Sequence, residues 1–166
     1  MLTMPTMDEI AKWPVEERLT RLARTPDELA ATLQGQPESV LGRRPDAKNF
    51  APKEVVCHLR DAERTFMERF QVIATNDEPR LFGPDPDRWA EEQQYLRHDT
   101  IVALGHFRRR REESLAYLRG LAPADWQRGG VHPVRGRLTV NDFVTIMTFH
   151  DLTHLAQLER GLRGEP

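Results

Sequence analysis

The segment TVNDFVTIMTFHDLTHLAQLERG, from Thr139 to Gly161, has the pattern of one long amphipathic helix. Its apolar positions recur in steps of three and four residues, which is the spacing of side chains on one helix face. The hydroxyl of Thr139 is suited to cap the first turn, with Asp142 three residues further on. We therefore expect a helix from Thr139 to near Gly161. Its buried stripe is predicted to consist of Val140, Phe143, Met147, His150, His154 and Leu158.

Two histidines interrupt this otherwise apolar stripe. His150 and His154 take the places between Met147 and Leu158, so their side chains should point into the protein. A spacing of four residues puts two imidazoles one turn apart on one face, within reach of a single metal ion. The alternative is a pair of hydrogen-bonded core histidines. Several partly buried imidazoles without a metal would, however, need several polar partners.

Three more segments have helical periodicity: residues 15–35, residues 51–75 and Thr100–Arg119. In the first, Thr25 and Pro26 form a good helix start that continues, or kinks, an earlier helical piece. Residues 76–87 are rich in proline, glycine and aspartate and are expected to form a loop. A short helical piece is expected around residues 89–96. The pattern for a β-hairpin around VHPVRGRLTV is weak.

These four long segments predict an all-α protein, a four-helix bundle in which metal and cofactor sites are built from facing helices. The length fits one domain over residues 1–166, with its core at about 15–161. The basic run at residues 108–111 is followed at once by two glutamates. We expect a solvated helix face with local charge pairing there, and an anion site is the alternative.

His58 is the best candidate for a third metal ligand, because it lies beside the apolar stripe of the predicted helix 51–75. Three neutral histidines leave coordination positions open, which is typical of a catalytic rather than a structural site. Asp61 is one turn away and is a candidate general base, or it could orient an imidazole. Asp151, next to His150, is a second candidate for orienting an imidazole. Cys57 is expected to be a small core residue.

The composition limits the classes of partner. A net charge of −2 gives no general reason to bind nucleic acid. No apolar run approaches the length needed to cross a membrane, and no signal peptide is expected. A single cysteine fits a reducing compartment, so a cytoplasmic location is expected.

The stretches NFAPKEVVCHLRDAE and TVNDFVTIMTFHDLTHLAQL resemble the two hallmark segments of the DinB-like (DinB/YfiT) superfamily. The resemblance implies a four-helix bundle of the DinB/YfiT type with a divalent metal held by three histidines, which here match His58, His150 and His154. Characterised members include thiol-dependent S-transferases and a thiol-dependent isomerase. The resemblance also implies a homodimer. One departure is that Phe50 and Ala51 stand where the family commonly has Trp and Ser, just before the proline of the helix that carries His58. That position serves packing and capping, so the departure does not affect the metal site.

Two functional hypotheses follow. The first is a metal-dependent enzyme acting on a small molecule, either a hydrolase or a thiol S-transferase with a low-molecular-weight thiol as cosubstrate. The second is a non-catalytic metal-binding or stress-response protein. Imidazole suits zinc, nickel, copper or iron, and we expect zinc or nickel. A pocket open to the metal without a fourth protein ligand would favour the enzyme, and a sealed site would favour the second hypothesis.

Overall fold

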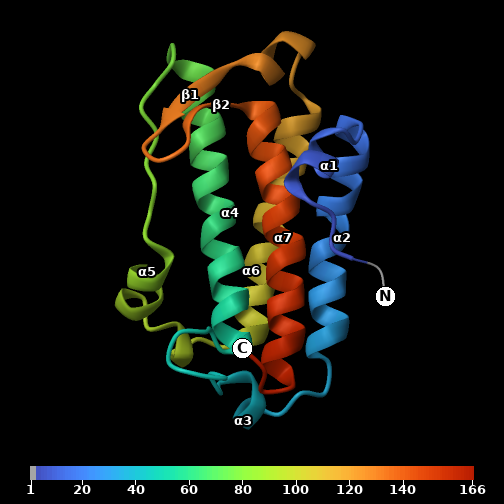
Figure 1. Cartoon of the computed structure of the whole chain (residues 1–166), viewed down its shortest axis with the longest axis vertical. Coiled ribbons are helices and arrows are strands. Elements are labelled where there is room, and N and C mark those ends of the chain that lie inside the picture. The colour runs from blue at the N-terminus through green and yellow to red at the C-terminus, as the bar shows by residue number, and fades with distance from the viewer. Residues whose placement is uncertain (1–2) are drawn as a thin grey trace.

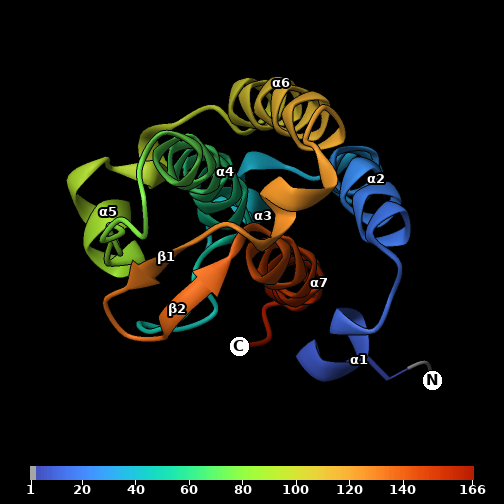
Figure 2. The ribbon, with the colours of Figure 1, turned by 90° about the horizontal axis from the view of Figure 1, so that it is seen from above.

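The structure is a computed structural model that describes residues 3–166, and it is mostly helical (Figure 1). Seen from the end, four long helices form a ring in which α4 lies between α6 and α7, and α2 closes the other side (Figure 2). This arrangement confirms the expected all-α four-helix bundle. The long helices are α2 (Val15–Leu33), α4 (Pro52–Thr75), α6 (Thr100–Arg119) and α7 (Val140–Leu162). None of the helices in the described part of the chain is long and apolar enough to cross a membrane.

Short elements cover the ends and one side of the bundle. The strands β1 (Gly129–His132) and β2 (Gly136–Thr139) form an antiparallel hairpin, so the weak hairpin pattern is confirmed. The expected short helix appears as α5 (Pro86–Glu92), followed by the 3-10 turn η1. Three of the other four short elements, all except η1, were not predicted. The remaining short elements are α1 (Met7–Ala11), α3 (Glu38–Leu41), η1 (Tyr95–Arg97) and η2 (Pro123–Gln127).

The hairpin holds the loop that leads into α5. The backbone N–H of Val131 donates to the carbonyl of Pro79, and the N–H of Leu81 donates to the carbonyl of Val131. A Cβ at Gly130 would lie 2.8 Å from the Pro79 carbonyl oxygen, so this close approach requires glycine. Through this contact the loop passes along α4 and places α5 beside it (Figure 2).

Local capping explains where α7 begins. The Thr139 hydroxyl accepts the N–H of Asp142 at 3.0 Å, and the Asp142 carboxylate accepts the N–H of Thr139 at 2.8 Å. The predicted cap is confirmed. Thr25 does not begin a new helix, because α2 runs through Pro26 without a break, and the expectation that this stretch continues an earlier helical piece is confirmed. The Thr25 hydroxyl instead donates to Asp151 across the bundle at 2.5 Å.

A charged layer separates the two apolar halves of the core. Arg111 of α6 is only 2% exposed, and its guanidinium donates to Glu63 of α4 at 2.7 and 2.9 Å. It also donates to Asp151 of α7 at 2.6 and 3.1 Å, and to the Leu22 carbonyl of α2 at 2.8 Å. One side chain on α6 thus binds each of the other three long helices.

The solvated face expected for the basic run is therefore wrong for Arg111. Successive residues on a helix point about 100° apart, so four adjacent arginines cannot share one face. Arg108 pairs with Asp27 at the surface, and Arg109 is exposed. Arg110 donates to Asp61 and to the carbonyl of Arg60 on α4.

We predict that Arg111→Leu lowers the free energy of unfolding by about 3–5 kcal/mol, because it leaves two buried carboxylates without a cation. Arg108→Leu removes an exposed pair and should cost less than about 1 kcal/mol. Urea denaturation monitored by circular dichroism measures both variants. Equal losses for the two arginines would contradict the central role of Arg111.

Candidate metal centre

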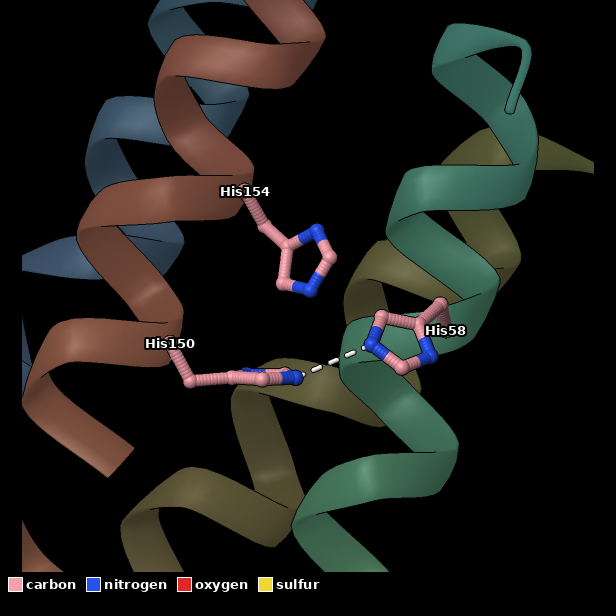
Figure 3. A group of neighbouring side chains, drawn as sticks. All are labelled: His58, His150 and His154. Atoms are coloured by element: carbon pink, nitrogen blue, oxygen red, sulfur yellow. Dashed lines mark hydrogen bonds between the residues drawn. The ribbon is translucent and has the colours of Figure 1, made fainter. Parts of the chain in front are cut away.

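Three histidine side chains meet between α4 and α7. His58 comes from α4, and His150 and His154 come from α7, with their rings turned toward one another (Figure 3). One nitrogen from each ring lies within 4.8 Å of the other two. The Nε2 atoms of His58 and His150 are 2.9 Å apart. The structure therefore brings together all three residues predicted to bind a metal, and their binding of an ion stays a prediction.

Gln157 orients one of these rings, and the sequence analysis missed it. The Nδ1 atom of His154 lies 2.7 Å from Oε1 of Gln157, an amide oxygen that accepts hydrogen bonds. The proton of a neutral ring is then on Nδ1, which leaves Nε2 with a free lone pair. The spacing of three residues on one helix was a signal that could have identified Gln157.

The surroundings keep the three imidazoles neutral. Burial, followed by the positive charge that His154 would carry, lowers the pKa of His58 from 6.5 to about 3. Burial also lowers the pKa of His150 well below its usual value, with further contributions from His154, His58 and Arg111. The pKa of His154 is lowered by burial as well. Neutral imidazole is the form that binds metal ions.

The donor set fits a divalent cation. Two metal–nitrogen bonds of about 2.0–2.1 Å place tetrahedral ligands roughly 3.4 Å apart. The 2.9 Å between His58 and His150 and the 4.8 Å limit for the whole group bracket that separation. Ring nitrogens at these distances repel unless a proton or a cation lies between them. No carboxylate or thiolate joins this group in residues 3–166.

The two aspartates expected at the site have other partners. Asp61 accepts hydrogen bonds from Arg60, Tyr95 and Arg110. Burial raises the pKa of Asp61, but the hydrogen bonds from Arg60 and Tyr95 outweigh it and lower the pKa. Asp151 accepts from Thr25 and Arg111. Neither carboxylate forms a hydrogen bond with one of the three imidazoles in these contacts, and a role for either aspartate in orienting a ring stays a prediction. The role of Asp61 as a general base stays a prediction that its hydrogen bonds do not support.

Two hollows open onto the histidines. The first is a cavity of about 280 Å³, and His58 and His150 line it together with Arg69, His132 and Arg135. Its other lining residues are Ala62, Thr65, Phe66, Pro84, Pro86 and Trp89. The second hollow has a volume of about 330 Å³ and adds Lys48, Phe50, Asp87, His154 and Gln157 to His58, His150 and Pro86. The histidines are thus accessible from two hollows, and Pro86 of α5 lines both.

Comparison with known proteins identifies the family. The family model described as the DinB superfamily matches residues 21–158, which include all three histidines. The chain belongs to the DinB superfamily. The resemblance noted in the two histidine segments is thereby confirmed.

Relatives of this DinB superfamily chain carry similar names. Two proteins of Oceanobacillus iheyensis, both named "putative metal-dependent hydrolase", are 29% and 21% identical to it. The first alignment covers 64% of this chain and 61% of the relative, and the second covers 95% and 87%. This chain therefore spans less than two thirds of the length of the first relative.

A solved structure has the same fold. YfiT from Bacillus subtilis, described as a probable metal-dependent hydrolase with an unusual four-helix bundle topology, has a TM-score of 0.84 and 20% identity. The match covers 98% of this chain and 91% of YfiT. It confirms the predicted bundle of the DinB/YfiT type.

We predict that metal-free protein loses stability as the pH falls below about 6.5. The unfolded chain takes up protons on its histidines there, whereas folded His58 stays neutral down to about pH 3. Each such histidine contributes a loss of about 1.4 kcal/mol per pH unit. Urea denaturation at pH 4.5–7.5 gives the slope of the unfolding free energy against pH. In His58→Gln this slope should be smaller than in wild type, by the equivalent of about one proton. His106→Gln, a change at an exposed histidine, should match wild type, and equal slopes in both variants would refute the prediction.

Proposed function

We propose that this DinB superfamily chain is a divalent-metal-dependent hydrolase of small molecules, with His58, His150 and His154 as the metal ligands. The observation that carries the proposal is the convergence of three neutral imidazoles at the wall of an open cavity, without a fourth histidine, cysteine or carboxylate among residues 3–166. Such a site leaves coordination positions for water and substrate. The names of the relatives support the same class of reaction.

The residues of the chain have distinct parts in this proposal. The three histidines hold the ion, and Gln157 fixes the tautomer of His154 through its amide oxygen. When bound, a divalent ion supplies Lewis-acid chemistry, which activates water near neutral pH and polarises a carbonyl or phosphoryl oxygen. Phe66 lies edge-to-face with the His150 ring, with 5.9 Å between the ring centres, and supplies an apolar wall beside the site. Imidazole ligands suit zinc, nickel, copper or iron, and zinc or nickel is the ion that we propose.

A thiol S-transferase is the second candidate, and the two hollows favour it. They meet at His58 and His150 and would admit two different ligands. The thiol would have to come from solution, because the only cysteine is unsuited. Cys57 is fully buried, and burial raises its pKa to about 11. A homodimer, the other implication of the family resemblance, is testable by light scattering.

We predict about one equivalent of zinc or nickel in protein purified without a tag or chelator. His58→Ala and His154→Ala should each retain little metal, because removal of one of three ligands leaves a weak site. Elemental mass spectrometry measures the content, and His106→Ala serves as the control at an exposed position. Absence of metal from wild type, together with failure to take it up on reconstitution, would leave the histidines as polar core residues.

Turnover distinguishes the enzyme from a non-catalytic metal-binding protein. Metal-loaded protein is incubated with a panel of small esters, amides and phosphate esters, with and without an added low-molecular-weight thiol. Hydrolysis without thiol that is lost in His58→Ala supports the hydrolase, whereas turnover that requires the thiol supports the transferase. Full metal occupancy with no turnover of any compound would favour the non-catalytic hypothesis.

We predict that Gln157→Leu weakens metal binding about 10- to 100-fold, because it removes the hydrogen bond that orients His154. Gln157→Glu should retain or strengthen binding, since a carboxylate accepts the same proton. Competition with a chromogenic chelator measures both affinities. Equal affinities for wild type and the leucine variant would refute a role for Gln157.

A further inference from the structure

The cavity beside the histidines is lined by cationic side chains and by no carboxylate. Arg69, on α4, and Arg135, in the hairpin turn, both line it, and no aspartate or glutamate does. Neither arginine forms a salt bridge with a residue in the described part of the chain. Two cations therefore face one cavity without counter-charges.

Arg69 is held in place before any ligand binds. Its Nε and Nη2 atoms donate to the carbonyl of Phe82 at 3.2 and 2.8 Å. Its guanidinium also lies 5.7 Å from the centre of the Phe66 ring and 5.3 Å from that of Phe143. These contacts fix the position of the positive charge, and no hydrogen bond of Nη1 to a described residue competes with a ligand. A fixed cation loses little conformational entropy when it binds an anion.

His132 adds a third donor. Its Nδ1 atom accepts the backbone N–H groups of Val134 and Arg135, each at 3.2 Å. The proton of the neutral ring must then be on Nε2. Burial, with help from Arg69 and Arg135, lowers the pKa of His132 and keeps the ring neutral. The ring therefore offers an N–H group to the cavity, in the same way as the arginines.

Apart from Thr65, His58 and His150, the rest of the wall is apolar. Ala62, Phe66, Pro84, Pro86 and Trp89 line the cavity, and the volume of about 280 Å³ suits a compact molecule. A ligand that matches these surfaces has an apolar body and an acceptor-only head. Carboxylate and phosphate are the groups that pair with arginine in this way.

We propose that this cavity binds a small anionic substrate, whose carboxylate or phosphate head is held by Arg69, His132 and Arg135 while its apolar body packs against Phe66 and Trp89. The adjoining bond of the substrate then lies at His58 and His150. This placement of the reactive bond rests on the proposed function, but binding of the head group does not, because the metal-free chain carries all three donors.

The test is calorimetric titration of full-length, chelator-treated protein with phenylacetate, phenyl phosphate and the neutral analogue phenylacetamide. We expect at least one anion to bind about tenfold more tightly than the amide, as a charge-assisted pair requires. The anion that binds more tightly identifies the head group. Equal binding of anions and amide, or no binding of either anion, would overturn the proposal.

Variants test the assigned donors. Arg69→Gln and Arg135→Gln should each weaken anion binding about five- to tenfold, and Arg135→Lys should recover most of the loss. Arg109→Gln is the matched control, because Arg109 is an exposed arginine on α6 that lines a different hollow. Arg135 is also exposed, so its substitution tests the proposal even where Arg69→Gln fails to fold. Losses of less than twofold at Arg135, or equal losses at Arg109, would overturn it.

Metal content of the same preparations separates this proposal from the proposed function. Arg69→Gln and Arg135→Gln should take up as much zinc as wild type, since neither arginine belongs to the histidine group. Anion binding without metal uptake would support the anion site and refute the metal-dependent hydrolase. Metal uptake without preference for anions would support the metal site of the proposed function and refute the anion site.

Discussion

The buried guanidinium of Arg111 is the contact on which the rest of the bundle depends. It joins α6 to Glu63 of α4, to Asp151 of α7 and to the backbone of α2. Glu63 lies five residues after His58, and Asp151 follows His150 directly. Because each helix is rigid, fixing one face in the charged layer also fixes the rotation of the neighbouring face. The same ion pairs that hold the bundle therefore direct the histidines toward one another.

A charged layer is a costly way to fill a core. Desolvation of three charges offsets much of their attraction, so apolar side chains of the same volume would often be as stable. What the layer adds is register. An apolar core tolerates small slides of one helix along another, whereas the guanidinium of Arg111 can donate to both Glu63 and Asp151 only at one relative height. For a site made from two helices, a slide of 1 Å would be enough to separate the ligands.

Local signals in the sequence were sufficient for much of the fold. The caps at Thr139 and Asp142 and the apolar stripes gave the bounds of the long helices, and the stripe of α7 also placed two histidines inside. Long-range contacts were not accessible in this way. Arg111 is one of four adjacent arginines, although its steps of four from Phe107 and to Leu115 were a usable signal for burial. Two of the three donors to Asp61, Tyr95 and Arg110, come from a 3-10 turn and another helix, whose approach no local pattern reveals.

The two halves of the proposed site belong to different parts of the chain. The histidines lie on long helices packed into the core, whereas His132 and Arg135 lie in a β-hairpin at one end of the bundle (Figure 1). Few core contacts constrain a hairpin turn, so its length and charge vary at little expense to folding. Substrate preference would then evolve by exchange of this turn while the reactive centre stays the same. The bundle would then serve as a constant scaffold. The turn between the strands is the segment to graft or randomise when a new specificity is sought.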